Sequence, residues 1–296
     1  MPKSSRKDFI RLSGLGLLSG LMPRLPGNSL FSFDTRARLS VQLYSVRNEL
    51  ARDLSGTLKR LAVLGFTHVE TAFWPKEISL ERAGEQLTMA GLSVSSSHIE
   101  IPIGPNRQKM LDTARVFGTK TVIWHGWPED KRYSSLEGTR ELIGIYNEAG
   151  KFAKDNGLRF GLHNHWWEYR NRVAGKFVYE ILDAELDRDL FFEVDTYWVK
   201  VAGQDPAAII EKLGERVRLM HIKDGPARWH ENLATDNPDP MTAVGKGTQD
   251  FPAIFKAAKD HPEWVVIEMD KTATDVFEAL EQSLEYMKLH RFARLA

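Results

Sequence analysis

The 296-residue chain is long enough for one large domain or two small ones, and its hydrophobic fraction of 42% is ordinary for a globular protein. Forty Lys and Arg residues balance forty Asp and Glu residues, which disfavours a protein that holds nucleic acid through phosphate contacts. The absence of Cys excludes both a disulfide scaffold and a thiol nucleophile.

The N-terminal residues have the pattern of an export signal. Arg6 and Lys7 precede Phe9 and Ile10, and a short apolar run follows over residues 12–22. This resembles a twin-arginine signal in which Lys7 replaces the second Arg. The run is too short to be a permanent membrane span. We therefore expect a signal-like or disordered segment over residues 1–35 and a periplasmic protein; a cytoplasmic protein with an N-terminal extension is the alternative.

From residue 39 onward, apolar strand patterns alternate with amphipathic helix patterns. In the first half, the sequence predicts strands over residues 39–43, 68–72, 92–98 and 121–125. It predicts helices over residues 54–64, 80–90, 107–117 and 136–156, each of which is followed by a Gly.

The same rhythm continues in the second half. Strands are expected at 159–163, 190–195, 217–222 and 265–269, and helices at 177–182, 206–213, 252–259 and 276–289. Eight strand–helix units predict a single (β/α)₈ TIM barrel over residues 36–296. A doubly wound open sheet is the alternative, but it would have a Gly-rich phosphate turn after the first strand, where this chain has Gln42-Leu43-Tyr44-Ser45.

Ionisable residues lie at the ends of seven of the eight predicted strands, where the active site of such a barrel is found. They are Glu70, then His98 and Glu100, His125, His163 and His165, Glu193 and Asp195, His221 with Lys223 and Asp224, and Glu268 and Asp270. The last four strands thus offer imidazole, carboxylate, imidazole and carboxylate. Such a set predicts one divalent metal ion, and it suits Mn²⁺, Zn²⁺, Co²⁺ or Fe²⁺ better than Ca²⁺.

Several segments resemble the sugar phosphate isomerase/epimerase superfamily, whose members share a xylose isomerase-like barrel. The segments are FEVDTYW at 192–198, MHIKDG at 220–225, GKGTQDFPAI at 245–254, VVIEMD at 265–270, VQLYSVR at 41–47 and GFTHVE at 65–70. The resemblance covers residues 39–290. It is weak on substrate, because the superfamily includes epimerases, isomerases, dehydratases and endonucleases.

The resemblance also implies a ligand set. Members usually hold the metal with Glu, Asp, His and Glu on strands five to eight, and Asp195, His221 and Glu268 match the last three. His163, in HNHWWE, stands where many members have the first Glu. His163 is therefore the expected fourth ligand, with His165 and Glu168 as alternatives. The exchange also removes one of the two carboxylates that epimerases of the family use as an acid–base pair.

Roles for the other residues follow from their places. We expect Glu268, Glu168 and His165 to transfer protons. The expected substrate contacts are Glu70, His98 and His125 to hydroxyl groups, Trp124 to a sugar ring, and Lys223, Asp224 and Lys246 near the ligand. Because side chains alternate along a strand, Lys223 should share the face of His221, and Asp224 should lie on the other face.

The function predicted from these residues is a metal-dependent isomerase or epimerase that acts on a sugar or keto-sugar through a metal-stabilised enolate. A lyase, either a dehydratase or a 3-keto-glycoside eliminase, is the alternative within enzymes. A non-catalytic sugar-binding module is the alternative of another class, and the even charge balance disfavours an abasic-site endonuclease. No nucleic acid partner and no stable membrane span are expected, and an oligomer is compatible with the sequence.

Overall fold

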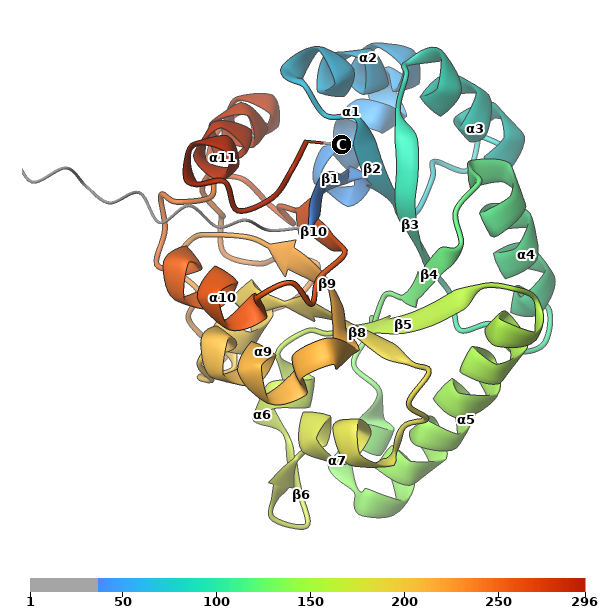
Figure 1. Cartoon of the computed structure of the whole chain (residues 1–296), viewed down its shortest axis with the longest axis vertical. Coiled ribbons are helices and arrows are strands. Elements are labelled where there is room, and N and C mark those ends of the chain that lie inside the picture. The colour runs from blue at the N-terminus through green and yellow to red at the C-terminus, as the bar shows by residue number, and fades with distance from the viewer. Residues whose placement is uncertain (1–36, 296) are drawn as a thin grey trace, which may run out of the picture. The chain divides into compact units, whose positions relative to one another are not determined.

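Eight parallel strands close into a barrel in the computed structural model, which describes residues 37–295 (Figure 1). Around the barrel the strands follow the order β1-β10-β9-β8-β5-β4-β3-β2, and a separate two-stranded hairpin is formed by β6 and β7. Consecutive barrel strands are neighbours, and helices lie outside them. The TIM barrel predicted from the sequence is therefore confirmed.

The barrel strands are β1 (Arg38–Gln42), β2 (His68–Thr71), β3 (Ser93–Ile99), β4 (Thr121–Trp124), β5 (Arg159–His163), β8 (Phe191–Asp195), β9 (Val217–Ile222) and β10 (Trp264–Ile267). The hairpin strands are β6 (Arg172–Val173) and β7 (Lys176–Phe177). The helices are α1 (Arg47–Arg52), α2 (Leu54–Leu64), α3 (Leu80–Met89), α4 (Asn106–Phe117), α5 (Leu136–Asp155), α6 (Trp167–Arg170), α7 (Val178–Glu185), α8 (Thr196–Val201), α9 (Pro206–Leu213), α10 (Phe251–Ala258) and α11 (Val276–His290).

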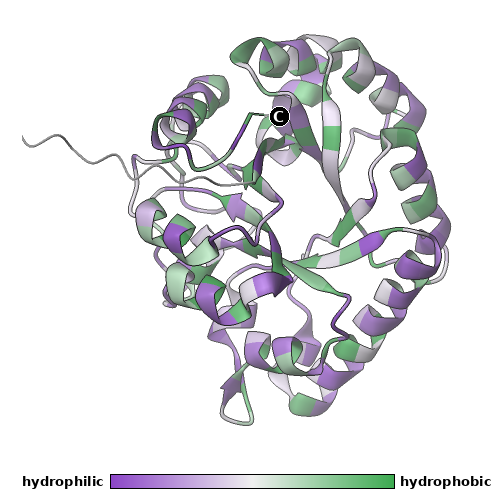
Figure 2. Ribbon diagram, in the orientation of Figure 1, coloured by the Kyte–Doolittle hydropathy of each residue, from purple (hydrophilic) through white to green (hydrophobic). Residues whose placement is uncertain are grey.

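The helix ends have local causes in the sequence. Asp53 and Ser135 cap the N-termini of α2 and α5 by accepting hydrogen bonds from the backbone N–H groups of Gly56 and Gly138. Gly65 ends α2 with φ of 108°, a left-handed conformation that Gly adopts without strain. Apolar residues of the helices face the barrel and polar residues face outward (Figure 2).

Side chains inside the barrel change from apolar to polar along each of the late strands. On β8 the inward residues are Phe191, Glu193 and Asp195, because every second side chain faces the interior. Phe191 belongs to an apolar cluster with Ile123, Leu219, Trp264 and Val266. A Cβ atom at position 161 would collide with the Phe191 ring, so Gly161 makes room for it. This cluster forms the floor on which the polar residues rest.

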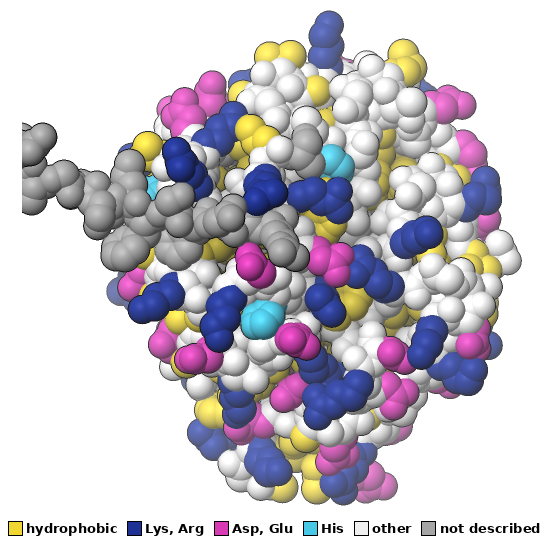
Figure 3. All heavy atoms as spheres, viewed as in Figure 1, with side chains coloured by type: hydrophobic (Ala, Val, Ile, Leu, Met, Phe, Trp, Pro, Cys, Tyr) yellow, Lys and Arg dark blue, Asp and Glu magenta, His cyan; other side chains and the backbone are white. Residues whose placement is uncertain are grey.

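None of the helices within residues 37–295 is long and apolar enough to cross a membrane. The signal-like segment expected over residues 1–35 lies outside the described residues, so the periplasmic location stays a prediction. On the face of the molecule drawn in Figure 3, acidic and basic side chains are interspersed.

Candidate metal centre and cavity

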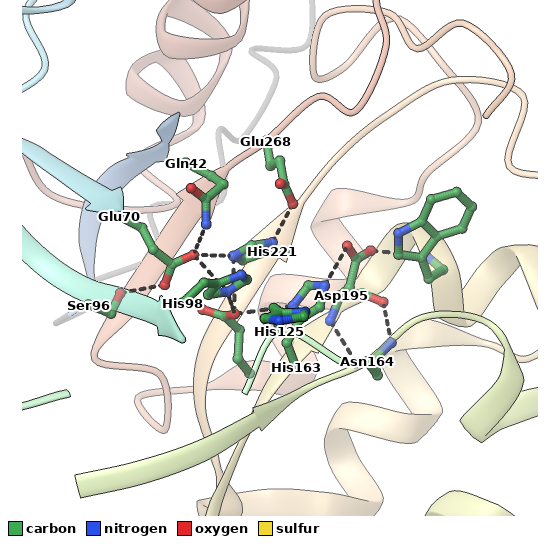
Figure 4. A network of polar contacts seen from close by, with 12 residues as sticks. Gln42, Glu70, Ser96, His98, His125, His163, Asn164, Asp195, His221 and Glu268 are labelled. Atoms are coloured by element: carbon green, nitrogen blue, oxygen red, sulfur yellow. Dashed lines mark hydrogen bonds and ion pairs between the residues drawn. The ribbon is translucent and has the colours of Figure 1, made fainter. Parts of the chain in front are cut away.

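Polar side chains from several barrel strands converge in one network (Figure 4), in which we distinguish an inner layer around Glu193 and Glu70 from an outer cluster of His163, Asp195, His221 and Glu268. The inner layer has Glu193 at its centre. Its Oε2 atom lies 2.7 Å from His98 Nε2, 3.1 Å from His163 Nδ1 and 3.2 Å from His221 Nε2. Glu193 is fully buried, so the free energy of removing its charge from water must be offset by these imidazoles.

Glu70 is the second carboxylate of the inner layer. Its Oε1 atom accepts a hydrogen bond from Gln42 Nε2 at 2.7 Å and lies 2.6 Å from His221 Nε2. Its Oε2 atom accepts a hydrogen bond from the Ser96 hydroxyl at 2.5 Å. Glu70 is fully buried and does not line the cavity described below, so it holds His221 in place and has no access to a substrate. Glu70 was expected to contact the substrate, but in the structure it contacts His221, one of the expected metal ligands.

The inner layer sets the charge of its histidines. Burial alone would lower the pKa of His98, but Glu70 and Glu193 outweigh it and raise the pKa to about 9. Burial, and after it the neighbouring His221, holds the pKa of His163 well below its usual range. His163 is therefore neutral, which is the form that binds a metal ion.

The outer cluster brings together the four residues expected as metal ligands. One ligand atom from each of His163, Asp195, His221 and Glu268 lies within 4.8 Å of the others. His221 Nδ1 is 2.6 Å from Glu268 Oε2, and His163 Nε2 is 3.8 Å from Asp195 Oδ2. In a second group, one ligand atom from each of His98, His163, Glu193 and His221 also lies within 4.8 Å of the others. This group shares the imidazoles of His163 and His221 with the first.

The bonds made by the shared imidazoles favour the outer cluster as the metal site. The inward nitrogens of His163 and His221 face Glu193 and Glu70, so the outward nitrogens are the ones that a metal ion would use. Nε2 of His163 is available, whereas Nδ1 of His221 would exchange its 2.6 Å contact with Glu268 for the ion. Metal-binding histidines commonly use their second nitrogen in this way, with a carboxylate behind the ring.

Asp195 supplies a further test of the fit. Its Oδ1 atom caps α8 by accepting a hydrogen bond from the Trp198 N–H at 2.9 Å, and its backbone N–H donates to Asn164 Oδ1 at 2.9 Å. Its Oδ2 atom is buried, makes no well-aligned hydrogen bond in the described part of the chain, and forms an ion pair with Lys223 Nζ at 2.9 Å. A carboxylate fixed by its first oxygen, with its second oxygen already facing a positive charge beside two outward imidazole nitrogens, fits a divalent cation.

Lys223 lies beside this cluster on the same face as His221, as the alternation predicts. Its Nζ atom is 2.9 Å from Asp195 Oδ2, 2.8 Å from Glu268 Oε2 and 2.7 Å from Asp270 Oδ2. Burial opposes charge on Glu268, but Lys223 and His221 outweigh it and hold the pKa of that carboxyl far below its usual range. Burial raises the pKa of Asp270 to about 6 even though Lys223 acts in the opposite direction.

A cavity of about 240 Å³ opens above the outer cluster. Of the expected site residues, His98, His125, His163, His165, Lys223 and Glu268 line it. Burial lowers the pKa of His125 to about 3 and, with Lys223, holds the pKa of His165 well below its usual range. The Nδ1 atom of His165 is buried and has no hydrogen-bond partner among residues 37–295.

Two expected site residues face a different cavity. Glu168 and Trp124 line a space of about 20 Å³ among Tyr133, Tyr169 and Tyr179, which has room for one water molecule. The Oε2 atom of Glu168 accepts a hydrogen bond from the His165 N–H at 3.0 Å. Neither residue lines the larger cavity. The expectations that Glu168 transfers protons and that Trp124 stacks on the sugar therefore lose their geometric basis, because α6 turns Glu168 back into the protein.

Asp224 and Lys246 also lie away from the cavity. The Asp224 carboxylate accepts hydrogen bonds from the backbone N–H groups of Gly225, Gly245, Gly247 and Gln249, at 2.8 to 3.2 Å. A Cβ atom at Gly247 would collide with Asp224, so Gly permits this close approach. Asp224 fixes the long loop after β9, and Lys246 is exposed within it. Asp224 and Lys246 were expected to contact the substrate, but neither lines the cavity, and Asp224 holds the loop in place instead.

Sequence reasoning gave no role to several residues that complete the site: Gln42, Tyr44, Phe73, Ser96, Trp127, Glu193 and Asp270. The period-2 pattern held a signal for two of them. Glu193 is two residues before Asp195, and Asp270 is two residues after Glu268, so each pair faces the same way. Tyr44, Phe73 and Trp127 lie in loops, where no such pattern applies.

Curated relatives include two inosose dehydratases. The protein from Clostridium beijerinckii is 25% identical over 173 residues, covering 54% of this chain and 57% of the relative. The protein from Erwinia tasmaniensis is 26% identical over 179 residues, covering 55% and 58%. The match thus spans somewhat more than half the length of these relatives.

Solved structures share the fold over a larger part of the chain. A sugar phosphate isomerase/epimerase from Parabacteroides distasonis has a TM-score of 0.70 and 24% identity, covering 88% of this chain and 96% of that one. The D-allulose 3-epimerase from Methylomonas sp. in complex with D-allulose has a TM-score of 0.63 and 16% identity, covering 88% and 99%. The IOLI protein with a bound zinc atom has a TM-score of 0.62 and 14% identity, covering 86% and 98%.

The family assignment rests on a match to most of the barrel. Residues 58–290 match the family described as the xylose isomerase-like TIM barrel. The chain belongs to the xylose isomerase-like TIM barrel family, as its sequence motifs indicate.

Proposed function

We propose that this chain is a metal-dependent enzyme that removes a proton from the carbon next to the carbonyl group of a keto-sugar, and that elimination follows. His163, Asp195, His221 and Glu268 would hold the metal ion. When bound, a divalent ion polarises the carbonyl group and lowers the free energy of the charge that develops on it. The identity of the family, together with relatives that are dehydratases and epimerases, supports chemistry of this class.

The observation that carries the proposal is the placement of two carboxyl groups on one wall of the cavity. Glu268 and Asp270 both follow β10, both line the cavity and both contact Lys223 Nζ, at 2.8 and 2.7 Å. In the strand order, β4 lies directly across the barrel from β10, and β5 is next to β4. The titratable side chains that line the cavity from that opposite wall are, among the described residues, the imidazoles of His125, His163 and His165.

An acid and a base on one wall suit elimination from one face of the sugar. Glu268 would accept the proton from the α-carbon, and Asp270 would donate a proton to the oxygen that leaves the β-carbon. One C–H bond and one C–O bond break, a C=C bond forms, and the leaving group departs protonated. Lys223 contacts both carboxyl groups and can pass the proton from Glu268 back to Asp270.

Isomerisation or epimerisation, the outcome first expected from the sequence, is the second candidate. Epimerisation needs an acid on one face of the carbon and a base on the other. His165 favours it, because this residue lines the wall across from Glu268 and burial holds its pKa well below the usual range, so that it is neutral and can accept a proton.

Turnover in heavy water separates the two outcomes. The protein, loaded with Mn²⁺ or Zn²⁺, would be incubated with an inosose, D-allulose and other ketohexoses, and the products followed by NMR. Elimination gives an unsaturated product and releases water or another group, whereas epimerisation introduces deuterium at the α-carbon without loss of a group. If no substrate exchanges its α-proton with either metal, the proposed chemistry is wrong.

A further inference from the structure

The outer part of the cavity is aromatic, in contrast to the polar centre. Tyr44, which follows β1, Phe73, which follows β2, and Trp127, which follows β4, all line it. Phe73 is 50% exposed and Trp127 is 45% exposed, although each is a large apolar side chain. Exposed aromatic residues that gather at a cavity commonly mark a binding surface. We call these three residues the aromatic rim.

Each ring of the aromatic rim is held by its own contact. Trp127 Nε1–H donates a hydrogen bond to Thr235 Oγ1 at 2.7 Å, from the loop after β9. The Phe73 ring packs edge-on against the His125 ring, with centroids 5.0 Å apart. The Arg47 guanidinium lies 4.0 Å from the centre of the Tyr44 ring. Rings that are already fixed lose little conformational entropy when a ligand stacks on them.

The charges around the cavity disfavour an anionic ligand. Among the described residues that line it, Lys223 is the only Lys or Arg, while Asp236, Glu268 and Asp270 are acidic. Lys223 is already paired with three carboxylates. A phosphate group held away from the metal ion would therefore find no unpaired Lys or Arg among the described residues that line the cavity, whereas an uncharged ring needs none.

We propose that the aromatic rim is a subsite for an uncharged ring attached to the sugar, so that the substrates are ring-bearing, unphosphorylated sugars such as glycosides. The proposal rests on the proposed function in one respect, because it places the sugar over the outer cluster. An aromatic ring and the apolar face of a second sugar can both stack on Tyr44, Phe73 or Trp127, since both present C–H groups or a flat apolar surface to the rings.

Binding without turnover tests this subsite. The full-length protein would be titrated with phenyl β-D-glucoside, methyl β-D-glucoside, cellobiose and glucose 6-phosphate by calorimetry and ligand-observed NMR, with Mn²⁺ and again with chelator. We expect the phenyl glucoside to bind about tenfold more tightly than the methyl glucoside, as stacking on one or two rings would give. Cellobiose should also bind more tightly than the methyl glucoside if a second sugar ring stacks on the aromatic rim. Glucose 6-phosphate should bind most weakly.

Variants identify the residues responsible. Trp127→Ala and Phe73→Ala should each remove most of the difference between the phenyl and methyl glucosides. Trp229→Ala is the matched control, because Trp229 is 42% exposed but lies outside the cavity. The proposal is wrong if the phenyl glucoside gains nothing over the methyl glucoside, if both rim variants keep the full difference, or if glucose 6-phosphate binds most tightly. The phenyl glucoside could still bind more tightly than the methyl glucoside in the presence of chelator, while the metal-loaded protein turns over no substrate. That result would contradict the proposed function and leave the subsite supported.

Discussion

The inner layer and the outer cluster are built from the same kinds of side chain, yet they are left in different states. Every imidazole nitrogen that faces the inner layer has a carboxylate oxygen within 3.2 Å, from Glu70 or Glu193. In the outer cluster, Asp195 Oδ2 lies 2.9 Å from Lys223 Nζ, and His163 Nε2 is 3.8 Å from the same oxygen. Glu193 Oε1 also lacks a hydrogen-bond partner among the described residues, so the layers differ in arrangement and not in completeness. Carboxylates behind the imidazole rings orient them, whereas the outer cluster gathers two carboxylates and two outward ring nitrogens that can bind a metal ion.

The largest effect on this comparison is expected when the charge of the Asp195 carboxylate is removed. Asp195→Asn keeps an oxygen that can cap α8, because Asn is as good an N-cap residue as Asp, but it removes the charge that would bind the metal. We expect the metal content to fall from one ion per chain toward zero and kcat/KM to fall by about a thousandfold, since the ion supplies several kcal/mol to catalysis.

Metal analysis after dialysis, together with circular dichroism as the control for folding, measures this effect. Glu268→Gln should behave in the same way, because the same cluster would lose a ligand. If both variants fold and keep a full complement of metal, the ion binds elsewhere, and the outer cluster is not its site.

His163 at the end of β5 and His165 just after it sharpen the comparison, because of these two only His163 has one nitrogen in each layer. His163→Ala should lose metal and activity together. His165→Ala should keep its metal and lose activity by about a hundredfold, which is the usual loss when an acid–base group is removed. Metal content and turnover measured on the same samples separate the two. The reverse pattern would make His165 the ligand.

A change in the inner layer should have a smaller effect on metal binding. Glu193→Gln keeps the shape of the side chain but weakens its hydrogen bonds to His163 and His221, so their outward nitrogens become poorer ligands. We expect the metal Kd to rise by about 10- to 100-fold, as is typical when a carboxylate behind a metal-binding histidine is lost. Competition with a chelating dye measures the Kd, and a value within twofold of the wild type would leave Glu193 with a structural role only.

The fold was predictable because its signals are local and repeated. Each barrel strand lies within two residues of its predicted bounds, because an apolar run followed by an amphipathic helix recurs eight times. Helices α1, α6 and α8 were missed, since four to six residues are too few to show a helical period. The hairpin of β6 and β7 has two residues in each strand and carries no pattern at all.

The candidate site was predictable only where strands determine it. Alternation along β9 places Lys223 with His221 and sends Asp224 to the loop, as expected. The same rule does not reach Glu168, because β5 ends at His163 and α6 begins at Trp167. Nor can a sequence show that Phe73 and Trp127, 54 residues apart, share one cavity. Loop residues are positioned by contacts that are distant in the chain.

Glu168 provides the smallest test, and one that needs no metal. Burial raises the pKa of this carboxyl to about 8 from an ordinary value of 4.5, so the folded protein keeps a proton there that the unfolded chain releases. The raised pKa therefore leaves stability intact below pH 4.5 and reduces it as the pH rises toward 8. Between pH 6 and pH 8 the free energy of unfolding should fall by about 2 kcal/mol on this account.

Glu168→Gln removes this titration, while its amide oxygen can still accept the hydrogen bond from the His165 N–H. Urea unfolding of metal-free protein at pH 6, 7 and 8 should show that the variant gains stability over the wild type as the pH rises, by about 2 kcal/mol across this interval. Asp270→Asn, whose parent carboxyl lines the larger cavity, serves as the contrast in activity. Glu168→Gln should keep turnover close to that of the wild type, because Glu168 has no access to that cavity. If the variant folds and retains its metal but is inactive, Glu168 takes part in catalysis.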